Sequence, residues 1–259
     1  MKIMWLNPVP KRGNADDRFE RQLNGYALAG TEVEVRYLGR GPRHLEYAYY
    51  GALVLSDTMH LIKQAENDGI DGAVIGCFYD PGLVECREII DKMMVTAPME
   101  ASLHLACALG NTVSILIGRR KWIPFMRETV ARYGLSQRLA SFRDVGLGVL
   151  EFNRDPERTA ELLEREARLA VEDDGAEVII LGCTATHGFY RHLQEQLGVP
   201  VVDPVLAALD HVQRLVQVRD NFGWSHSKRG MYETPPIREI RDWGLESAYD
   251  LGTVWRDSS

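Results

Sequence analysis

The sequence predicts an α/β fold of two pseudo-symmetric lobes, each a parallel sheet flanked by helices, with the active site in the cleft between them. Three observations predict it: short apolar runs typical of buried strands, longer segments with helical spacing between them, and one strand-to-loop pattern that occurs twice. A chain of 259 residues, 45% of them hydrophobic, can also bury a sizeable core.

Strands and helices are expected to alternate along most of the chain. Apolar or β-branched runs bounded by Gly, Pro or Asp predict buried strands at 3–6, 31–38, 73–75, 112–117, 178–181 and 199–202. Helical spacing predicts helices at 53–66, 83–94, 101–109, 156–172 and 206–218. Such alternation favours parallel sheets, because parallel strands need a crossover connection.

One pattern occurs twice and predicts the two lobes. The segment GAVIGC at 72–77 resembles GAEVIILGC at 175–183, and VTAPME at 95–100 loosely matches VPVVDP at 199–204, each followed by a helix. We expect a first lobe from 1–98 with 208–222, a second lobe from 99–207, and a C-terminal extension at 223–259.

The extension breaks the alternation with many Gly, Pro and charged residues. It nevertheless holds Trp224, Trp243 and Trp255, three of the five tryptophans. Aromatic side chains of this size favour a packed segment over a disordered one. We expect it to cover a lobe, a partner subunit or the mouth of the cleft.

Composition excludes several classes of partner. The formal charge of −7 comes from 37 acidic and 30 basic residues without a basic block, so nucleic acid is not expected. The apolar N-terminus is too short for a signal peptide and no eighteen-residue apolar run occurs, so we expect a cytoplasmic protein that does not bind membranes. The spacing of the four cysteines predicts no metal site, and motifs for dinucleotides, nucleotides or serine hydrolysis are absent, so no cofactor is expected.

Two of the cysteines are candidates for catalysis. Cys77 and Cys183 each follow a predicted strand at its carboxyl end, where ligands bind in open α/β sheets. Amides of the next turn and the helix dipole can lower the pKa of a thiol there, although small buried cysteines are also common in cores. Opposed thiols suit racemisation, because one removes a proton from carbon and the other delivers one to the opposite face. Cys86 and Cys107 fall within predicted helices and are interpreted as packing residues.

Several motifs then resemble those of one enzyme superfamily. The segment GCFYDPGL at 76–83, with Arg87 and Glu88, resembles the signature of hydantoin and allantoin racemases. Residues 100–102 resemble their Gly-Glu-Ala segment, and LGCT at 181–184 resembles a motif of aspartate and glutamate racemases. The similarity runs from residue 3 to about residue 218. It implies two α/β lobes, no cofactor, a homo-oligomer, and Cys77 and Cys183 as the acid–base pair.

The chain departs from the pattern of these racemases in three places. Its first loop, which holds Asn7 and Pro8 as candidate site residues, reads Asn-Pro-Val-Pro instead of Asn-Pro-Asn followed by Ser or Thr, which removes side-chain hydrogen-bond donors. His44 stands where Ser is usual and Tyr50 where Asp is usual, which favours a more anionic substrate. The extension is longer than expected and is a candidate lid.

Further candidate residues flank the cysteines. Phe78 and Tyr79 are expected to line the pocket, and the hydroxyl and backbone amides of Thr184 and Ala185 to contact the substrate, although Thr also caps helices. His187, one helical turn after Cys183, can bind the thiol or a substrate carboxylate, or be a plain surface or capping residue. We include Glu100 on the resemblance, although an acidic residue also suits a helix start, and interpret Asp80 as structural.

These observations leave three hypotheses for a small-molecule substrate. The first is a racemase of a 5-substituted hydantoin or similar cyclic ureide. The second uses the same two cysteines for nucleophilic attack on a ring carbonyl or thiocarbonyl, or for decarboxylation or isomerisation of a small carboxylic acid. The third is a two-lobed protein that binds a small ligand without turnover.

Overall fold

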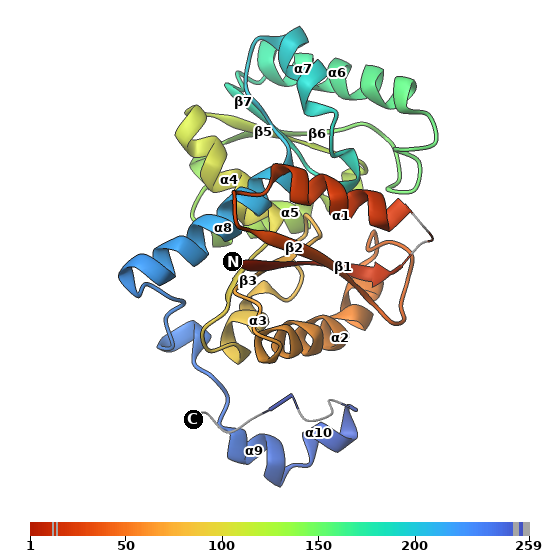
Figure 1. Ribbon diagram of the computed structural model, residues 1–259. Coiled ribbons are helices and arrows are strands. Elements are labelled where there is room, and N and C mark those ends of the chain that lie inside the picture. The colour runs from red at the N-terminus through yellow and green to blue at the C-terminus, as the bar shows by residue number, and fades with distance from the viewer. Residues whose placement is uncertain (12, 14, 251–253, 256–259) are drawn as a thin grey trace.

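Two four-stranded parallel sheets form the framework of the computed structural model, which describes residues 1–11, 13, 15–250 and 254–255. The first sheet has the order β2-β1-β3-β4, and the second has the corresponding order β6-β5-β7-β8 (Figure 1). The strands are β1 (Lys2–Pro10), β2 (Glu32–Leu38), β3 (Gly72–Ile75), β4 (Met94–Thr96), β5 (Val113–Ile117), β6 (Leu139–Asp144), β7 (Val178–Leu181) and β8 (Val201–Val202). The expected α/β class and its two similar sheets are confirmed.

Helices cover both faces of each sheet. They are α1 (Ala15–Tyr26), α2 (Ala48–Asn67), α3 (Leu83–Ile89), α4 (Pro98–Leu109), α5 (Ile123–Arg132), α6 (Pro156–Glu172), α7 (Tyr190–Leu197), α8 (Pro204–Phe222), α9 (Ile237–Asp242) and α10 (Leu245–Ala248). Short 3-10 turns lie at Arg120–Trp122, Ser136–Arg138, Thr184–Thr186 and Gly230–Tyr232. Within the described ranges, no helix has the length and apolar character needed to cross a bilayer.

A shared hydrophobic core joins the two sheets. It takes Val74 from β3, Ile115 from β5 and Val212 from α8, together with buried side chains of α1, α4 and α5. These helices lie between the sheets, whereas α2 and α3 cover the outer face of the first sheet and α6 and α7 that of the second (Figure 1). Because one core packs against both sheets, the strand ends of the two lobes are held in a fixed position relative to each other.

Two glycines fix the strand ends from which the candidate cysteines emerge. The Gly76 amide donates to the Leu6 carbonyl on β1 at 2.7 Å, and the Gly182 amide donates to the Leu116 carbonyl on β5 at the same distance. A Cβ atom on Gly182 would lie 2.5 Å from the Leu116 carbonyl oxygen, which is a backbone atom. Only glycine therefore allows this close approach.

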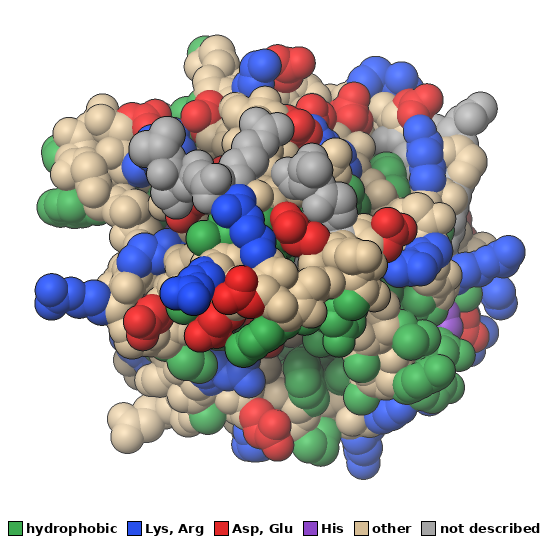
Figure 2. Space-filling model, turned by 90° about the horizontal axis from the view of Figure 1, so that it is seen from below, with side chains coloured by type: hydrophobic (Ala, Val, Ile, Leu, Met, Phe, Trp, Pro, Cys, Tyr) green, Lys and Arg blue, Asp and Glu red, His purple; other side chains and the backbone are tan. Residues whose placement is uncertain are grey.

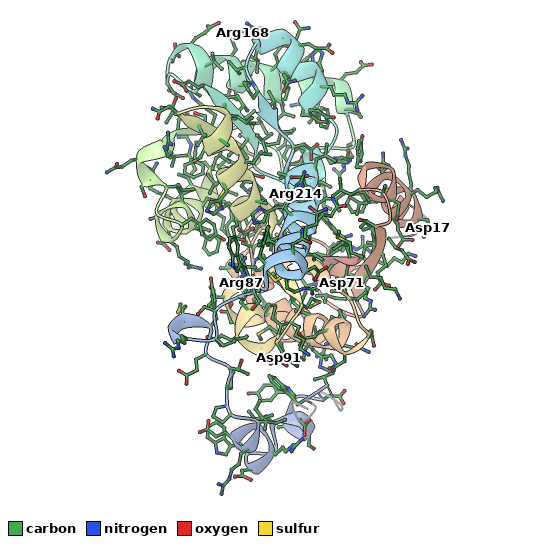
Figure 3. All side chains as sticks on the ribbon, turned by 60° about the vertical axis from the view of Figure 1, so that its left-hand side comes forward. Asp17, Asp71, Arg87, Asp91, Arg168 and Arg214 are labelled. Atoms are coloured by element: carbon green, nitrogen blue, oxygen red, sulfur yellow. The ribbon has the colours of Figure 1, made fainter. Side chains whose placement is uncertain are left out.

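The C-terminal extension packs against α2 and α3. The Lys228 ammonium donates to the carbonyls of Arg87 and Glu88 at the end of α3, at 2.5 and 3.1 Å. His226 Nε2 accepts a hydrogen bond from the Val95 amide of β4 at 3.0 Å, and burial lowers the pKa of this imidazole to about 4. Arg87 lies where α3, β4 and the extension meet (Figure 3).

The three tryptophans of the extension differ in how far they are buried. Trp255 packs on the α2 side of the core, with Lys63 Nζ 5.7 Å from its ring centre. Trp224 and Trp243 are each 66% exposed, so the body of this chain leaves these two side chains largely uncovered. Viewed from below, hydrophobic side chains reach the surface among acidic and basic ones (Figure 2).

The structure also corrects the predicted elements. The helix expected at 83–94 ends at Ile89, because the Glu66 carboxylate of α2 accepts hydrogen bonds from the amides of Asp91, Lys92 and Met93 and holds them in a turn. Strand β4 follows this turn and was not predicted as a strand. Strand β6 and helices α1, α5 and α7 were not predicted either.

Replacing Gly182 by alanine tests the role of close approach at the strand end. We expect the free energy of unfolding to fall by about 1–3 kcal/mol, because the new methyl group overlaps a backbone carbonyl oxygen and the neighbouring isoleucines. Urea unfolding measures the change. The control is Gly51→Ala on α2, where a Cβ meets no atom within 4 Å, so stability should hold or rise. Equal stability for both variants would contradict the argument.

Candidate active site

A cavity of about 400 Å³ lies at the carboxyl ends of the central strands, between the two lobes. Open α/β sheets bind their ligands at this edge. Its walls come from the ends of β1 and β2, from the loop before α2, and from the loops that follow β3, β6 and β7. The lining residues are Trp5, Asn7, Pro8, Val9, Pro10, Phe19, Tyr37, Arg43, His44, Leu45, Glu46, Gly76, Cys77, Phe78, Tyr79, Val149, Leu150, Asn153, Gly182, Cys183, Thr184 and Ala185.

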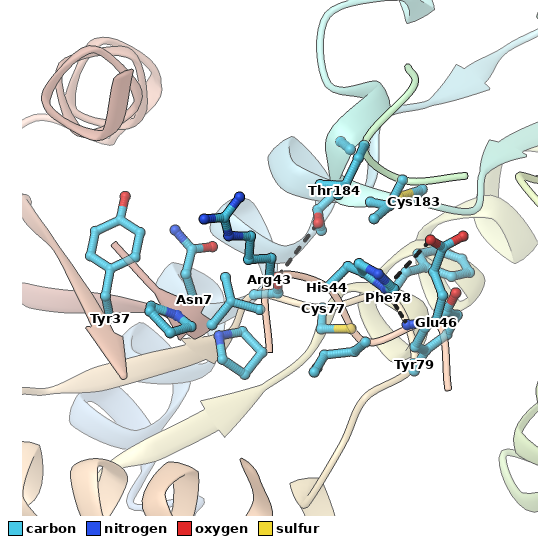
Figure 4. Close-up of a pocket in the computed structure, with 18 of the residues that line it drawn as sticks. Asn7, Tyr37, Arg43, His44, Glu46, Cys77, Phe78, Tyr79, Cys183 and Thr184 are labelled. Carbon is cyan, nitrogen blue, oxygen red and sulfur yellow. Dashed lines mark hydrogen bonds and ion pairs between the residues drawn. The ribbon is translucent and has the colours of Figure 1, made fainter. Parts of the chain in front are cut away.

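The two candidate cysteines enter this cavity from opposite lobes in matching surroundings (Figure 4). The Cys77 carbonyl accepts from the Asp80 amide, and the Cys183 carbonyl accepts from the Thr186 amide, both at 3.1 Å. Each turn brings the amide two residues further on to the thiol, that of Tyr79 to Cys77 and that of Ala185 to Cys183. The repeat in the sequence therefore corresponds to a repeat in local backbone geometry.

Burial sets the ionisation of both thiols. It raises the pKa of Cys77 and of Cys183 to about 12 each, and the amide hydrogen bonds lower these values only in part. The turn amides act in the expected direction, but burial outweighs them, so neither thiol has a pKa below that of free cysteine. A negative charge on Cys183 raises the pKa of Cys77 further, which makes simultaneous ionisation unfavourable.

A histidine and a carboxylate occupy one side of the cavity. Glu46 is only 8% exposed, and its carboxylate lies 3.5 Å from His44 Nδ1, which also accepts a hydrogen bond from the Glu46 amide. A negative charge at Glu46 also raises the pKa of Cys183. His44 therefore turns its Nδ1 atom toward Glu46.

Aromatic and loop residues complete the walls much as expected. Tyr79 stacks on Trp122 with ring centres 4.1 Å apart, and Phe78 is buried beside it. Asn7 Oδ1 accepts a hydrogen bond from Trp5 Nε1 at 3.0 Å, which fixes the Asn7 amide at the cavity edge. The Thr184 hydroxyl contacts the Gly76 carbonyl at 3.5 Å and so links the two lobes beside the thiols.

Asp80 joins the Cys77 loop to the second half of the chain. Its buried carboxylate accepts from the amides of Met99 and Glu100 at the start of α4 and from the Tyr133 hydroxyl, at 2.6 to 2.9 Å. Its φ of 48° lies in the left-handed region, which is uncommon for a residue other than glycine. Burial raises the pKa of this carboxyl to about 7, although the three donors act in the opposite direction. These contacts support a structural role.

Two predicted site residues lie outside the cavity. Glu100 is held by the Arg87 guanidinium at 2.6 Å and by the Thr96 hydroxyl at 2.9 Å, because a buried carboxylate needs partners. His187 Nδ1 lies 3.0 Å from the Asp203 carboxylate, which also caps the start of α8. Neither side chain lines the cavity that holds the thiols, so the expected placement of Glu100 and His187 in the site is corrected.

Other lining residues were not predicted from the sequence. Tyr37 lies near the end of a predicted strand, so the carboxyl-end rule could have found it. Arg43 and Glu46 lie in an irregular loop, and Val149, Leu150 and Asn153 follow the unpredicted strand β6. Among the described residues, no group of three or more His, Cys, Asp or Glu side chains is arranged to hold a metal ion.

Comparison with known proteins identifies the family. A sequence model of the Asp/Glu/hydantoin racemase family matches residues 17–212. The chain belongs to the Asp/Glu/hydantoin racemase family. It is 33% identical to a hydantoin racemase of Pseudomonas sp. (strain NS671) over 239 residues, which cover 92% of this chain and 94% of that protein. It is 37% identical to a hydantoin racemase of Paenarthrobacter aurescens over 243 residues, which cover 92% and 99%.

A solved structure agrees with this membership. The allantoin racemase of Pseudomonas fluorescens superposes with a TM-score of 0.83 at 29% identity, over 91% of this chain and 97% of that one. Arylmalonate decarboxylase, at 18% identity and a TM-score of 0.58, shares the fold. The expectations of this family and of an enzyme of the racemase type are confirmed.

Titration of the thiols tests the effect of burial. We expect Cys77 and Cys183 to ionise at higher pH than the value of about 8.5 of free cysteine, because burial removes water from the thiolate. Ultraviolet thiolate absorbance of the wild type is compared with that of Cys77→Ser and Cys183→Ser, and Cys107→Ser serves as a control outside the cavity. A midpoint for either cavity thiol below that of free cysteine would show that the amides outweigh burial.

Proposed function

We propose that this protein is a cofactor-independent racemase of a 5-substituted hydantoin or a similar cyclic ureide. The observation that carries the proposal is the pair of matching Gly-Cys turns that open into one cavity from opposite lobes. Membership of the racemase family and the relatives named hydantoin racemase support the same substrate class.

The chemistry requires a thiolate on one face of the ring carbon and a thiol on the other. The carbon-bound hydrogen of a hydantoin is acidified by the neighbouring carbonyl, so thiolate is a sufficient base. If Cys77 removes this proton, Cys183 protonates the opposite face, and the roles exchange for the other enantiomer. Backbone amides that follow each cysteine would stabilise the negative oxygen of the intermediate.

The ionisation of the thiols fits this division of roles. Because burial raises the pKa of both Cys77 and Cys183, neither is assigned permanently as base or acid. A thiolate of high pKa is a strong base, although only a small fraction is ionised near neutral pH. Repulsion between two thiolates disfavours double ionisation, so the ionised pair holds one thiolate and one thiol, which is the state that transfers both protons.

Proton exchange in deuterium oxide tests the proposed function. We expect 5-substituted hydantoins to take up deuterium at C5 and to lose optical rotation, and the rate to fall by at least about a thousandfold in Cys77→Ser and Cys183→Ser, since a hydroxyl is a far weaker acid–base group than a thiol. Proton NMR and polarimetry measure the two processes on one sample. Cys107→Ser, on α4 outside the cavity, should keep the wild-type rate.

Each remaining hypothesis predicts a different result in the same experiment. If the ring or a small acid is converted to a new compound, the same thiols carry out nucleophilic or decarboxylating chemistry and not racemisation. Binding without deuterium uptake would favour a ligand-binding protein. Racemisation that survives both serine substitutions would refute the two-cysteine mechanism.

A further inference from the structure

The charged side chains of the cavity are distributed unevenly. Among the lining residues that the structure describes, Arg43 carries the only permanent positive charge and Glu46 the only carboxylate. The guanidinium of Arg43 extends on the side of Asn7 and Tyr37, whereas Glu46 and Tyr79 lie on the other side of Cys77 (Figure 4). A substrate held between the thiols therefore meets opposite charges on its two sides.

Arg43 has no ion-pair or hydrogen-bond partner among the described residues. Its guanidinium donates to no Asp or Glu carboxylate and to no other acceptor in the described part of the chain. Arg40, three residues earlier in the same loop, is instead held by both oxygens of Asp57 at 2.8 and 3.0 Å. The donors of Arg43 are therefore free at the cavity, in a planar arrangement that matches a carboxylate.

His44 lies beside a carboxylate and is less suited than Arg43 to bind an anion. Its Nδ1 atom already accepts from the Glu46 amide and lies 3.5 Å from the Glu46 carboxylate. An anionic group placed on that side of the cavity would also be repelled by Glu46, which is largely buried. The charges of the described lining residues therefore favour an anion on the side of Arg43.

We propose that Arg43 is a specificity-determining residue that binds an anionic group, such as a carboxylate, on the C5 substituent of the ring. The inference rests on the proposed function and narrows its substrate class. The substituent points toward Arg43 and Asn7, and a ureide N–H, which is a donor, faces the Glu46 side. The thiols then reach the two faces of C5 in either enantiomer.

A pair of ring compounds of equal size tests the inference. 5-(2-Carboxyethyl)hydantoin carries the anion, and 5-(2-carbamoylethyl)hydantoin replaces it by a neutral amide. Steady-state polarimetry gives kcat and KM for the wild type, Arg43→Gln and Arg43→Lys. The control is Arg238→Gln on α9, which removes the same charge from a side chain that is 89% exposed and far from the cavity.

We expect the wild type to prefer the carboxylate, and Arg43→Gln to lose about tenfold in kcat/KM for it, mainly through KM, because the contact is charge-assisted but partly solvated. The wild type and Arg43→Gln should have equal kcat/KM for the carbamoyl compound. Arg43→Lys should restore part of the loss, added salt should reduce the wild-type preference, and Arg238→Gln should match the wild type.

The contrary outcomes separate the two proposals. An equal effect of Arg43→Gln on both compounds, or a wild-type preference for the amide, would overturn the role of Arg43 while leaving the racemase intact. If neither compound is racemised, the proposed function fails. Calorimetric binding of the same compounds to the wild type and to Arg43→Gln then still decides whether Arg43 selects the anion.

Discussion

The candidate active site depends on one repeated hydrogen bond, that between a glycine amide at a strand end and the carbonyl of the neighbouring central strand. Gly76 and Gly182 make it in the two sheets, and each places a cysteine one residue beyond the carboxyl edge. The shared core with α4 and α8 then sets the distance between the lobes. A Cβ atom would overlap the Trp5 ring at Gly76 and the Leu116 carbonyl at Gly182, so neither position accepts a larger side chain without displacing its neighbours.

The same burial that positions the thiols also controls their charge. Removing water from Cys77 and Cys183 raises both pKa values, and the two turn amides replace only part of the stabilisation that water would give the thiolates. A carboxylate at Glu46 adds to the effect on Cys183. Only a small fraction of each thiol is therefore ionised, but the thiolate that forms is a strong base. A bound substrate that excludes more water, or that offers a positive or hydrogen-bonding edge, would change the fraction of thiolate.

The sequence predicted the parts of the molecule that local patterns determine. Alternating strands and helices, and the repeated Gly-Cys, were sufficient for the fold class and for bringing Cys77 and Cys183 to one cavity. Contacts between residues far apart in the chain decided the rest. Glu66 on α2 accepts the hydrogen bonds that end α3. Arg87 pairs with Glu100, and Asp203 pairs with His187, so these two candidate site residues already have partners. Arg43 and Glu46 escaped notice because an irregular loop has no periodicity to mark which side chains face inward.

The contact of His226 with β4 has a consequence beyond the cavity. Strand β4 is an edge of its sheet, and an uncovered edge can add a strand from another molecule and so begin aggregation. His226 occupies the outward amide of Val95, and Arg87 donates to the carbonyl of the same residue. Because burial keeps this imidazole neutral at ordinary pH, it remains an acceptor there. The C-terminal extension thereby acts as an edge protector, and a chain shortened before it would expose a surface prone to self-association.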